Sequence, residues 1–285
     1  MTGKPAIPES YLECFKLIEL AAKNTNSAYM LIGATARDLL FESVGIRSQR
    51  LTYDIDISLS VDSWESFYQF KSSLIRQGFQ STPNNDHRLS YANPVNMPAA
   101  DKVLLDVVPH GGVNDQNFDV NWPSDGAIKM SVLGFQEAYD ARLKLVTQLG
   151  ITIPVVSVPG LCLLKLIAWL DRPSNIRTKD AQDIKFLLSN YESLSGIREA
   201  VFEEGFAEQQ NFDLDNACAA KLGNDVHQIS SKPTIDFLYS KLFSEKNDAT
   251  IEMLAIEMSN REESKAQQNY QTILAFRDGF TKQNT

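Results

Sequence analysis

Cysteine and histidine, the residues that build many small sites, are scarce in this chain of 285 residues. Its three cysteines lie far apart and show no CxxC spacing, and its three histidines are scattered as widely. Separated thiols argue against a disulfide framework and against a zinc site, and they favour a reducing, cytoplasmic location. The scattered histidines likewise argue against a metal site built on imidazoles.

The sequence also lacks a long hydrophobic run and a surplus of positive charge. The longest apolar stretch, residues 161–170, is interrupted by Lys165 and is too short to cross a bilayer. The first residues show no secretory pattern, so we expect no membrane partner. The net charge is −9 and the isoelectric point is near 4.9. Such an acidic balance argues against a broad nucleic-acid-binding surface, so any contact with RNA should be local.

The remaining composition is that of an ordinary globular protein, with 43% hydrophobic residues. Strand patterns and helix patterns mix in the first half, and only helical patterning follows residue 191. This order predicts an α+β fold: an N-terminal mixed sheet with flanking helices, followed by a C-terminal helical domain. We place the boundary near residue 158, which gives domains 1–158 and 159–285.

Local patterns give more detailed expectations. We expect strands at 28–32, 53–60 and 103–108, the last ended by the sequence PHGG. Residues 127–158 look like further strand segments, and a turn is expected near Asn224 within the helical half.

Two aspartates, Asp54 and Asp56, stand one residue apart in an apolar, β-branched segment. A strand sends alternate side chains to one face, so both carboxylates should point the same way. Two adjacent anions repel each other, and a fold accepts them best when a cation lies between them. The pair thus suggests a magnesium site that acts on phosphates. Taken alone, the pair fits two solvated aspartates at a strand edge somewhat better.

The preceding segment, residues 31–40, reads LIGATARDLL. A strand here ends in the small residues Gly33 and Ala34 and a helix follows at once, with Thr35 at its start. Backbone N–H groups at a helix start bind anions, and small residues let a phosphate approach closely. An ordinary tight turn from strand to helix would look the same.

A third aspartate, Asp106, interrupts six residues that are otherwise apolar. Burying an unpaired carboxylate costs several kcal/mol, so this side chain needs a partner. If its strand lies beside that of Asp54 and Asp56, three carboxylates gather around a metal. The alternative is a structural ion pair with an arginine or lysine.

Further along, Lys165 is the lone cation of an apolar helical segment, and the next helical segment contains Asp180 and Asp183. Aspartates three residues apart share one face of a helix. The lysine of one helix can therefore meet an aspartate of the next, and the spacing allows either aspartate.

Together, the glycine turn, the Asp-x-Asp strand and the single later Asp resemble the pattern of the polymerase-β-type nucleotidyltransferases. The order that continues with Lys-x-x-Ala and Lys-Asp-x-x-Asp resembles the AbiEii/AbiGii-like toxins of bacterial toxin–antitoxin and phage-defence modules. This resemblance covers about residues 28–190. It departs from the usual Gly-Gly or Gly-Ser turn at Ala34, and the spacing from Gly33 to Asp54 also resembles that of the CCA-adding enzymes.

The resemblance implies a reaction and a set of roles. A hydroxyl attacks the α-phosphate of an NTP and releases pyrophosphate, with Mg²⁺ (or Mn²⁺) held by carboxylates. The implied metal ligands are Asp54, Asp56 and Asp106, the last also helping to deprotonate the hydroxyl. The implied nucleotide-binding residues are Gly33, Ala34, Thr35, Arg37 and Lys165, with Asp180 or Asp183 orienting the lysine. The implied partners are an RNA (tRNA) or protein acceptor and a cognate antitoxin.

Two other functions stay open on the sequence. An antibiotic-modifying or housekeeping RNA nucleotidyltransferase shares the same core, and an acidic protein suits a cationic substrate. A binding module on an inactive nucleotidyltransferase fold belongs to another class. It would be expected to lose at least one carboxylate, and all three are present here.

Overall fold

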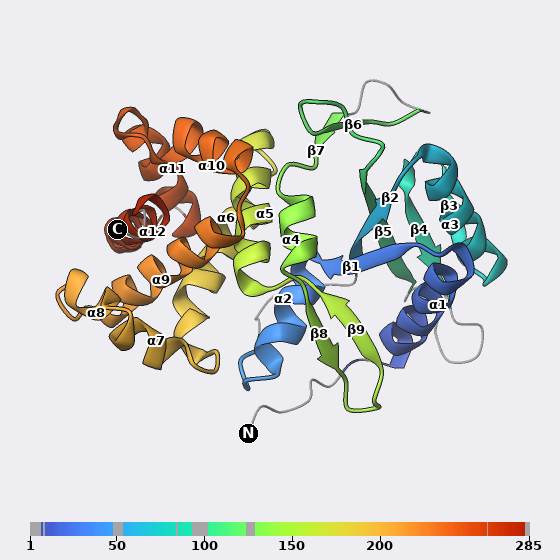
Figure 1. Cartoon of the computed structure of the whole chain (residues 1–285), viewed down its shortest axis with the longest axis horizontal. Helices are drawn as coiled ribbons and strands as arrows, with labels where there is room; N and C mark the ends of the chain where they lie inside the picture. The colour runs from blue at the N-terminus through green and yellow to red at the C-terminus, as the bar shows by residue number, and fades with distance from the viewer. Residues whose placement is uncertain are drawn as a thin grey trace. The chain divides into compact units, whose positions relative to one another are not determined.

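The computed structural model describes residues 7, 9–47, 54–83, 85–92, 102–123, 129–260 and 262–282 (Figure 1). The chain forms two compact units, Met1–Val156 and Ser157–Thr285. All strands among the described residues lie in the first unit, and the second unit is helical there. This is the α+β fold that the sequence predicts. Within those same ranges, no helix is long and apolar enough to cross a membrane.

The first unit is built on a seven-stranded sheet with the order β3-β4-β5-β2-β1-β9-β8, and β6 and β7 form a separate pair. The strands are β1 (Ala28–Ile32), β2 (Asp54–Val61), β3 (Gln80–Thr82), β4 (Asn85–Tyr91), β5 (Val103–Gly111), β6 (Asp119–Asn121), β7 (Lys129–Ser131), β8 (Leu143–Val146) and β9 (Thr152–Val155). The helices are α1 (Glu9–Thr25), α2 (Gly33–Glu42), α3 (Trp64–Arg76) and α4 (Phe135–Asp140).

The sheet is mixed. β2 runs parallel to β5 and antiparallel to β1, and β4 runs antiparallel to β5. The alternation in β2 decides its two faces, because Ile55, Ile57 and Leu59 are fully buried while Asp54 and Asp56 are half-buried. Helices α1 and α3 pack against each other and against strands of the sheet. The apolar face of β2 is therefore the core face, and the aspartates point away from it.

The second unit consists of helices, which begin with the hairpin of α5 and α6. They are α5 (Val158–Asp171), α6 (Thr178–Asn190), η1 (Tyr191–Ser193), α7 (Ile197–Glu203), α8 (Phe206–Gln209), α9 (Leu214–Ile229), α10 (Lys232–Leu238), η2 (Tyr239–Phe243), η3 (Glu245–Asn247), α11 (Asp248–Met258) and α12 (Glu263–Thr281). Helices α9 and α12 cross closely at two glycines. A methyl group on Gly279 would overlap the Ala220 carbonyl, and one on Gly223 would overlap that of Phe276.

Three local expectations are wrong. The turn expected near Asn224 is absent, because α9 runs through this buried residue without a break. The segment 127–158 contains the short helix α4, which begins after Gly134 in the left-handed conformation. Strand β5 does not end before Pro109 but continues to Gly111, since pairing with β2 carries it on to the Val61–Gly111 register. The start of the predicted strand at Tyr53 lies outside the described residues.

The extension of β5 buries His110. Its Nδ1 lies 2.8 Å from the hydroxyl of Ser58, and its Nε2 has no hydrogen-bond partner among the described residues. Burial lowers the pKa of His110 to about 4, against a small opposing effect of the Asp140 charge. The imidazole is thus neutral in the folded protein at neutral pH.

Acid should therefore destabilise the fold through His110. Between its unfolded and folded pKa values the unfolded chain binds the extra proton, so stability falls as the pH drops below about 6.5. We expect His110 to account for a loss of about 2 kcal/mol in unfolding free energy between pH 8 and pH 5. Urea denaturation of the full chain and of His110→Gln at both pH values measures this loss. Equal pH dependence of the two proteins would contradict it.

Candidate active site

The three sequence-selected carboxylates of the first unit come together on one face of the sheet. Asp56 and Asp106 are register partners on the parallel strands β2 and β5. Asp54 precedes Asp56 by two residues and so shares its face. The sequence argument required the strand of Asp106 to lie beside the strand of Asp54 and Asp56. The sheet has this arrangement, because β5 pairs with β2.

Asp106 has a partner of its own, Arg88 on β4. The two residues are register partners across the antiparallel β4–β5 pair. The guanidinium Nε donates to Oδ1 at 2.7 Å, and its NH2 group donates to Oδ2 at 2.5 Å. This bidentate fork is the strongest common arrangement between an arginine and a carboxylate. The ion pair that we held as the alternative for Asp106 therefore exists, beside the other two carboxylates.

Arg88 also lies in the field of the whole cluster. Its hydrogen bonds to Asp106 raise its pKa, burial opposes them, and the charges of Asp106, Asp54 and Asp56 raise it further. Sequence reasoning did not select this residue. The only signal was the demand that a buried Asp106 have a cationic partner, and nothing in the sequence said which cation meets it.

The start of α2 faces the same cluster. Gly33 begins the helix with φ +72°, and a side-chain carbon there would overlap the Asp56 carboxylate. Ile32, which occupies the capping position, makes no side-chain hydrogen bond to this helix end. The first N–H groups of α2 thus lie beside Asp56 without a side-chain acceptor from the cap, as an anion-binding helix start requires.

Two neighbouring residues have other contacts. The hydroxyl of Thr35 is buried and donates to the backbone carbonyl of Asp54 at 2.7 Å, which ties α2 to the start of β2. Arg37 is buried in α2 and pairs with Asp38, its Nε donating at 2.8 Å. Their expected roles in nucleotide binding, like that of the buried Ala34, remain predictions.

Gly33 and Gly45 allow a matched test of this contact. Both have positive φ, but a side-chain carbon at Gly45 meets nothing within 4 Å. Gly45→Ala should cost about 1–2 kcal/mol of stability from backbone strain alone. Gly33→Ala should cost about 1 kcal/mol more and reduce the transfer activity that the sequence resemblance implies more than about tenfold, because it displaces Asp56. Urea denaturation and a transfer assay on both variants measure this, and equal effects would contradict the role of the contact.

The donor chemistry of this face fits a divalent cation such as magnesium, which prefers carboxylate oxygens. The fit is not complete, since both oxygens of Asp106 accept hydrogen bonds from Arg88. In the part of the chain that the structure describes, no three His, Cys, Asp or Glu side chains are arranged to hold a metal ion. Metal binding by Asp54, Asp56 and Asp106 therefore stays a prediction.

The remaining predicted residues form a second cluster, in the helical unit. Lys165 of α5 is 3.0 Å from Asp180 and 2.7 Å from Asp183 of α6, so it contacts both candidate aspartates. Both carboxylates are buried, and Arg172 also binds Asp180, at 2.7 Å. Burial acts to lower the pKa of Lys165, but the charges of Asp183 and Asp180 outweigh it and the pKa is raised. The ammonium is therefore charged at neutral pH and fixed on two sides.

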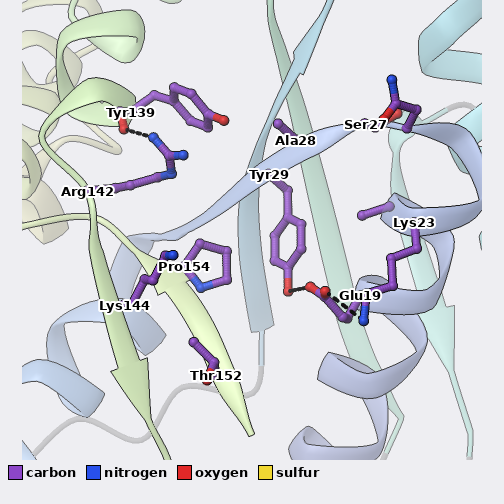
Figure 2. A pocket seen from close by; sticks show the side chains of 12 residues that line it. Glu19, Lys23, Ser27, Ala28, Tyr29, Tyr139, Arg142, Lys144, Thr152 and Pro154 are labelled. Carbon is purple, nitrogen blue, oxygen red and sulfur yellow. Dashed lines mark hydrogen bonds and ion pairs between the residues drawn. The ribbon is translucent and has the colours of Figure 1, made fainter.

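Figure 2 shows a separate cavity of the first unit, about 510 Å³ in volume, between α1, β1 and the β8–β9 hairpin. Lys23, Arg142 and Lys144 line it together with a single acid, Glu19. Glu19 accepts a hydrogen bond from Tyr29, and the guanidinium of Arg142 lies 3.8 Å from the centre of the Tyr139 ring. The cavity is thus electropositive, the opposite of the carboxylate face, and it contains none of the predicted site residues.

Comparison with known proteins adds one family match. The model of the family described as "Nucleotidyl transferase AbiEii toxin, Type IV TA system" matches residues 19–280. No curated protein sequence matches the chain significantly.

Solved structures give weaker likenesses. A nucleotidyltransferase-like protein from Paracoccidioides brasiliensis is 16% identical, with 76% of this chain and 94% of that chain covered and a TM-score of 0.44. The antibiotic-resistance factor ANT(2'')-Ia is 14% identical over 72% and 97%, with a TM-score of 0.35. A CCA-adding enzyme from Thermotoga maritima, solved with tRNA, is 12% identical over 97% and 80%, with a TM-score of 0.26. At these scores the likenesses carry no further argument.

Proposed function

The chain belongs to the AbiEii nucleotidyl transferase toxin family, and from that premise we propose that it transfers a nucleotidyl group from an NTP to an acceptor hydroxyl of RNA in a metal-dependent reaction. We further propose that it does so as the toxin of a toxin–antitoxin module. The observation that carries the proposal is the carboxylate face of Asp54, Asp56 and Asp106, with the uncapped start of α2 against it.

In this proposal Asp54, Asp56 and Asp106 hold divalent metal. A bound metal would lower the pKa of the attacking hydroxyl and neutralise charge that develops on the phosphate. The N–H groups that begin at Gly33 bind phosphate oxygens, because they carry the positive end of the helix dipole and the capping residue Ile32 has no side chain that binds them. Thr35 fixes this helix start relative to Asp54 through its hydrogen bond to the backbone.

Asp106 is the carboxylate proposed to accept the proton of the attacking hydroxyl. The pairing with Arg88 orients this carboxylate in the absence of substrate. Lys165 is proposed to bind triphosphate oxygens as a fixed point charge, and Asp180 and Asp183 are positioning residues that act through it.

The test is incorporation of each labelled NTP into total RNA, with and without magnesium. We expect label in RNA from at least one NTP, dependent on magnesium and lost in Asp54→Asn. Label in protein instead of RNA would identify protein as the acceptor. Label in aminoglycosides would favour an antibiotic-modifying enzyme. No labelling with any NTP and no NTP binding by calorimetry would overturn the proposal in favour of an inactive binding module.

A gene for a small antitoxin immediately upstream would support the toxin role. Co-expression of this antitoxin should then relieve the growth arrest that the active chain causes. It should not change the growth of a strain that expresses Asp54→Asn. Growth arrest by both forms alike would contradict toxicity through nucleotidyl transfer.

A further inference from the structure

Arg88 is a resident cation in a cluster of anions. The carboxylates of Asp54, Asp56 and Asp106 share one face of β2 and β5. Among the described residues, Arg88 forms an ion pair with Asp106 in this cluster. Side chains of Arg88 and Asp106 are 31% and 13% exposed, so solvent screens the pair only in part. Arg88 contacts Asp106 directly, and the charges of Asp54 and Asp56 also act on it.

The fork engages both oxygens of Asp106. Arg88 donates one hydrogen bond to each carboxylate oxygen, at 2.7 and 2.5 Å. A metal ion needs the lone pairs and the negative charge of the same oxygens. It would also meet the guanidinium at close range, where two like charges repel by several kcal/mol even at an effective dielectric constant of about 20. Arg88 and a metal on Asp106 therefore compete.

We propose that Arg88 is a built-in competitor for metal at Asp106: it neutralises the Asp106 carboxylate in the metal-free protein and must release it when a divalent cation binds. This inference rests on the proposed function, in which the three carboxylates are metal ligands. It makes Arg88 a determinant of metal affinity, and it links two properties of one side chain. The same contact that stabilises the metal-free fold weakens metal binding.

The sheet register makes such a release local. Arg88 and Asp106 face each other across β4 and β5, so breaking their side-chain contact leaves the backbone pairing of the two strands intact. Arg88 carries four rotatable side-chain bonds and is the more exposed partner, so it is the group that moves. A released guanidinium would remain beside the cluster, within reach of substrate phosphates.

The test measures metal binding and stability, not activity. Manganese binding to the full chain is followed by calorimetry, and thermal unfolding is followed with EDTA and with saturating manganese. We expect Arg88→Gln to bind manganese about tenfold more tightly than wild type, because a competing charge is gone. With EDTA its melting temperature should fall below that of wild type, and manganese should close most of the gap.

Lys71→Gln is the matched control. Lys71 of α3 binds Asp86, which like Arg88 is on β4, at 3.4 Å, and its side chain is 12% exposed. Losing this ion pair should lower the melting temperature but leave manganese affinity unchanged. If Arg88→Gln does not fold, Arg88→Lys keeps a cation but loses the fork, and it should bind manganese more tightly than wild type by a smaller factor.

The outcomes separate the inference from the function on which it rests. Manganese affinity that is unchanged or weaker in the Arg88 variants, with normal binding by wild type, overturns the competition and leaves the proposed function standing. Tight binding by Arg88→Gln and none by wild type would support the competition in a stronger form. No binding by either protein overturns the inference, and the labelling assay then decides the proposed function separately.

Discussion

Asp54→Ala should abolish nucleotidyl transfer, with a loss of at least about 100-fold, while the melting temperature of the metal-free protein stays unchanged or rises. The first effect follows if Asp54 binds metal that stabilises the transition state. The second follows from repulsion, because Asp54 shares a face with Asp56 and with Asp106. Removing one of three like charges relieves that repulsion in the folded state.

Asp86→Ala is the appropriate control for this prediction. Asp86 is a carboxylate of β4 that pairs with Lys71 of α3. We expect this variant to keep its transfer activity and to melt at a lower temperature, the reverse of Asp54→Ala. Labelling assays and thermal unfolding with EDTA measure both properties. An Asp54→Ala protein that fails to fold would mean that the carboxylate serves a structural ion pair.

Lys165→Met should cost about 3–5 kcal/mol of unfolding free energy, the largest stability effect that we predict. Lys165 is the ion-pair partner of both Asp180 and Asp183, which are buried on α6. Without the ammonium, Asp180 keeps Arg172 as an ion-pair partner, but Asp183 loses the Lys165 charge in a buried position. Urea denaturation of the full chain measures the change.

An exposed lysine calibrates this result. Lys232 pairs with Asp236 four residues later on α10, with side chains 83% and 61% exposed. Lys232→Met should change stability by less than about 1 kcal/mol, because water screens the pair. Asp183→Asn combined with Lys165→Met should recover part of the loss, since it removes the buried charge that has lost Lys165. Equal effects of the two lysine substitutions would show that the buried pairs are not energetically important.

The sequence predicts the carboxylate face well because its logic is local. Alternation places Asp54 and Asp56 on one side of any strand, and helical spacing lets Asp180 and Asp183 both meet Lys165. The prediction needed only one contact between segments that are distant in the sequence, the pairing of β2 with β5. The free-energy cost of burying an unpaired Asp106 argued for that contact.

Arg88 and α4 were beyond this kind of reasoning. The contact between Arg88 and Asp106 depends on the register of β4 against β5, which is fixed by packing across the whole sheet. The six residues of α4 are too few to display a helical period, and their start depends on the positive φ of Gly134. At Asn224 the sequence predicted a turn where the structure has a helix. Packing within the second unit overrides the weak helix preference of asparagine there.

The close crossing of α9 and α12 has a consequence for the order of events during translation. Gly223 and Gly279 let the two backbones touch, so each helix buries this surface against the other. α12 ends at Thr281, whereas the strands of the first unit are complete at Val155. A nascent chain can therefore finish its sheet well before α9 gains its partner. The helical unit, with the Lys165 cluster, reaches its final stability only after about 125 further residues have been made. At ordinary rates of about 5–20 residues per second, this is a delay of roughly 6 to 25 seconds.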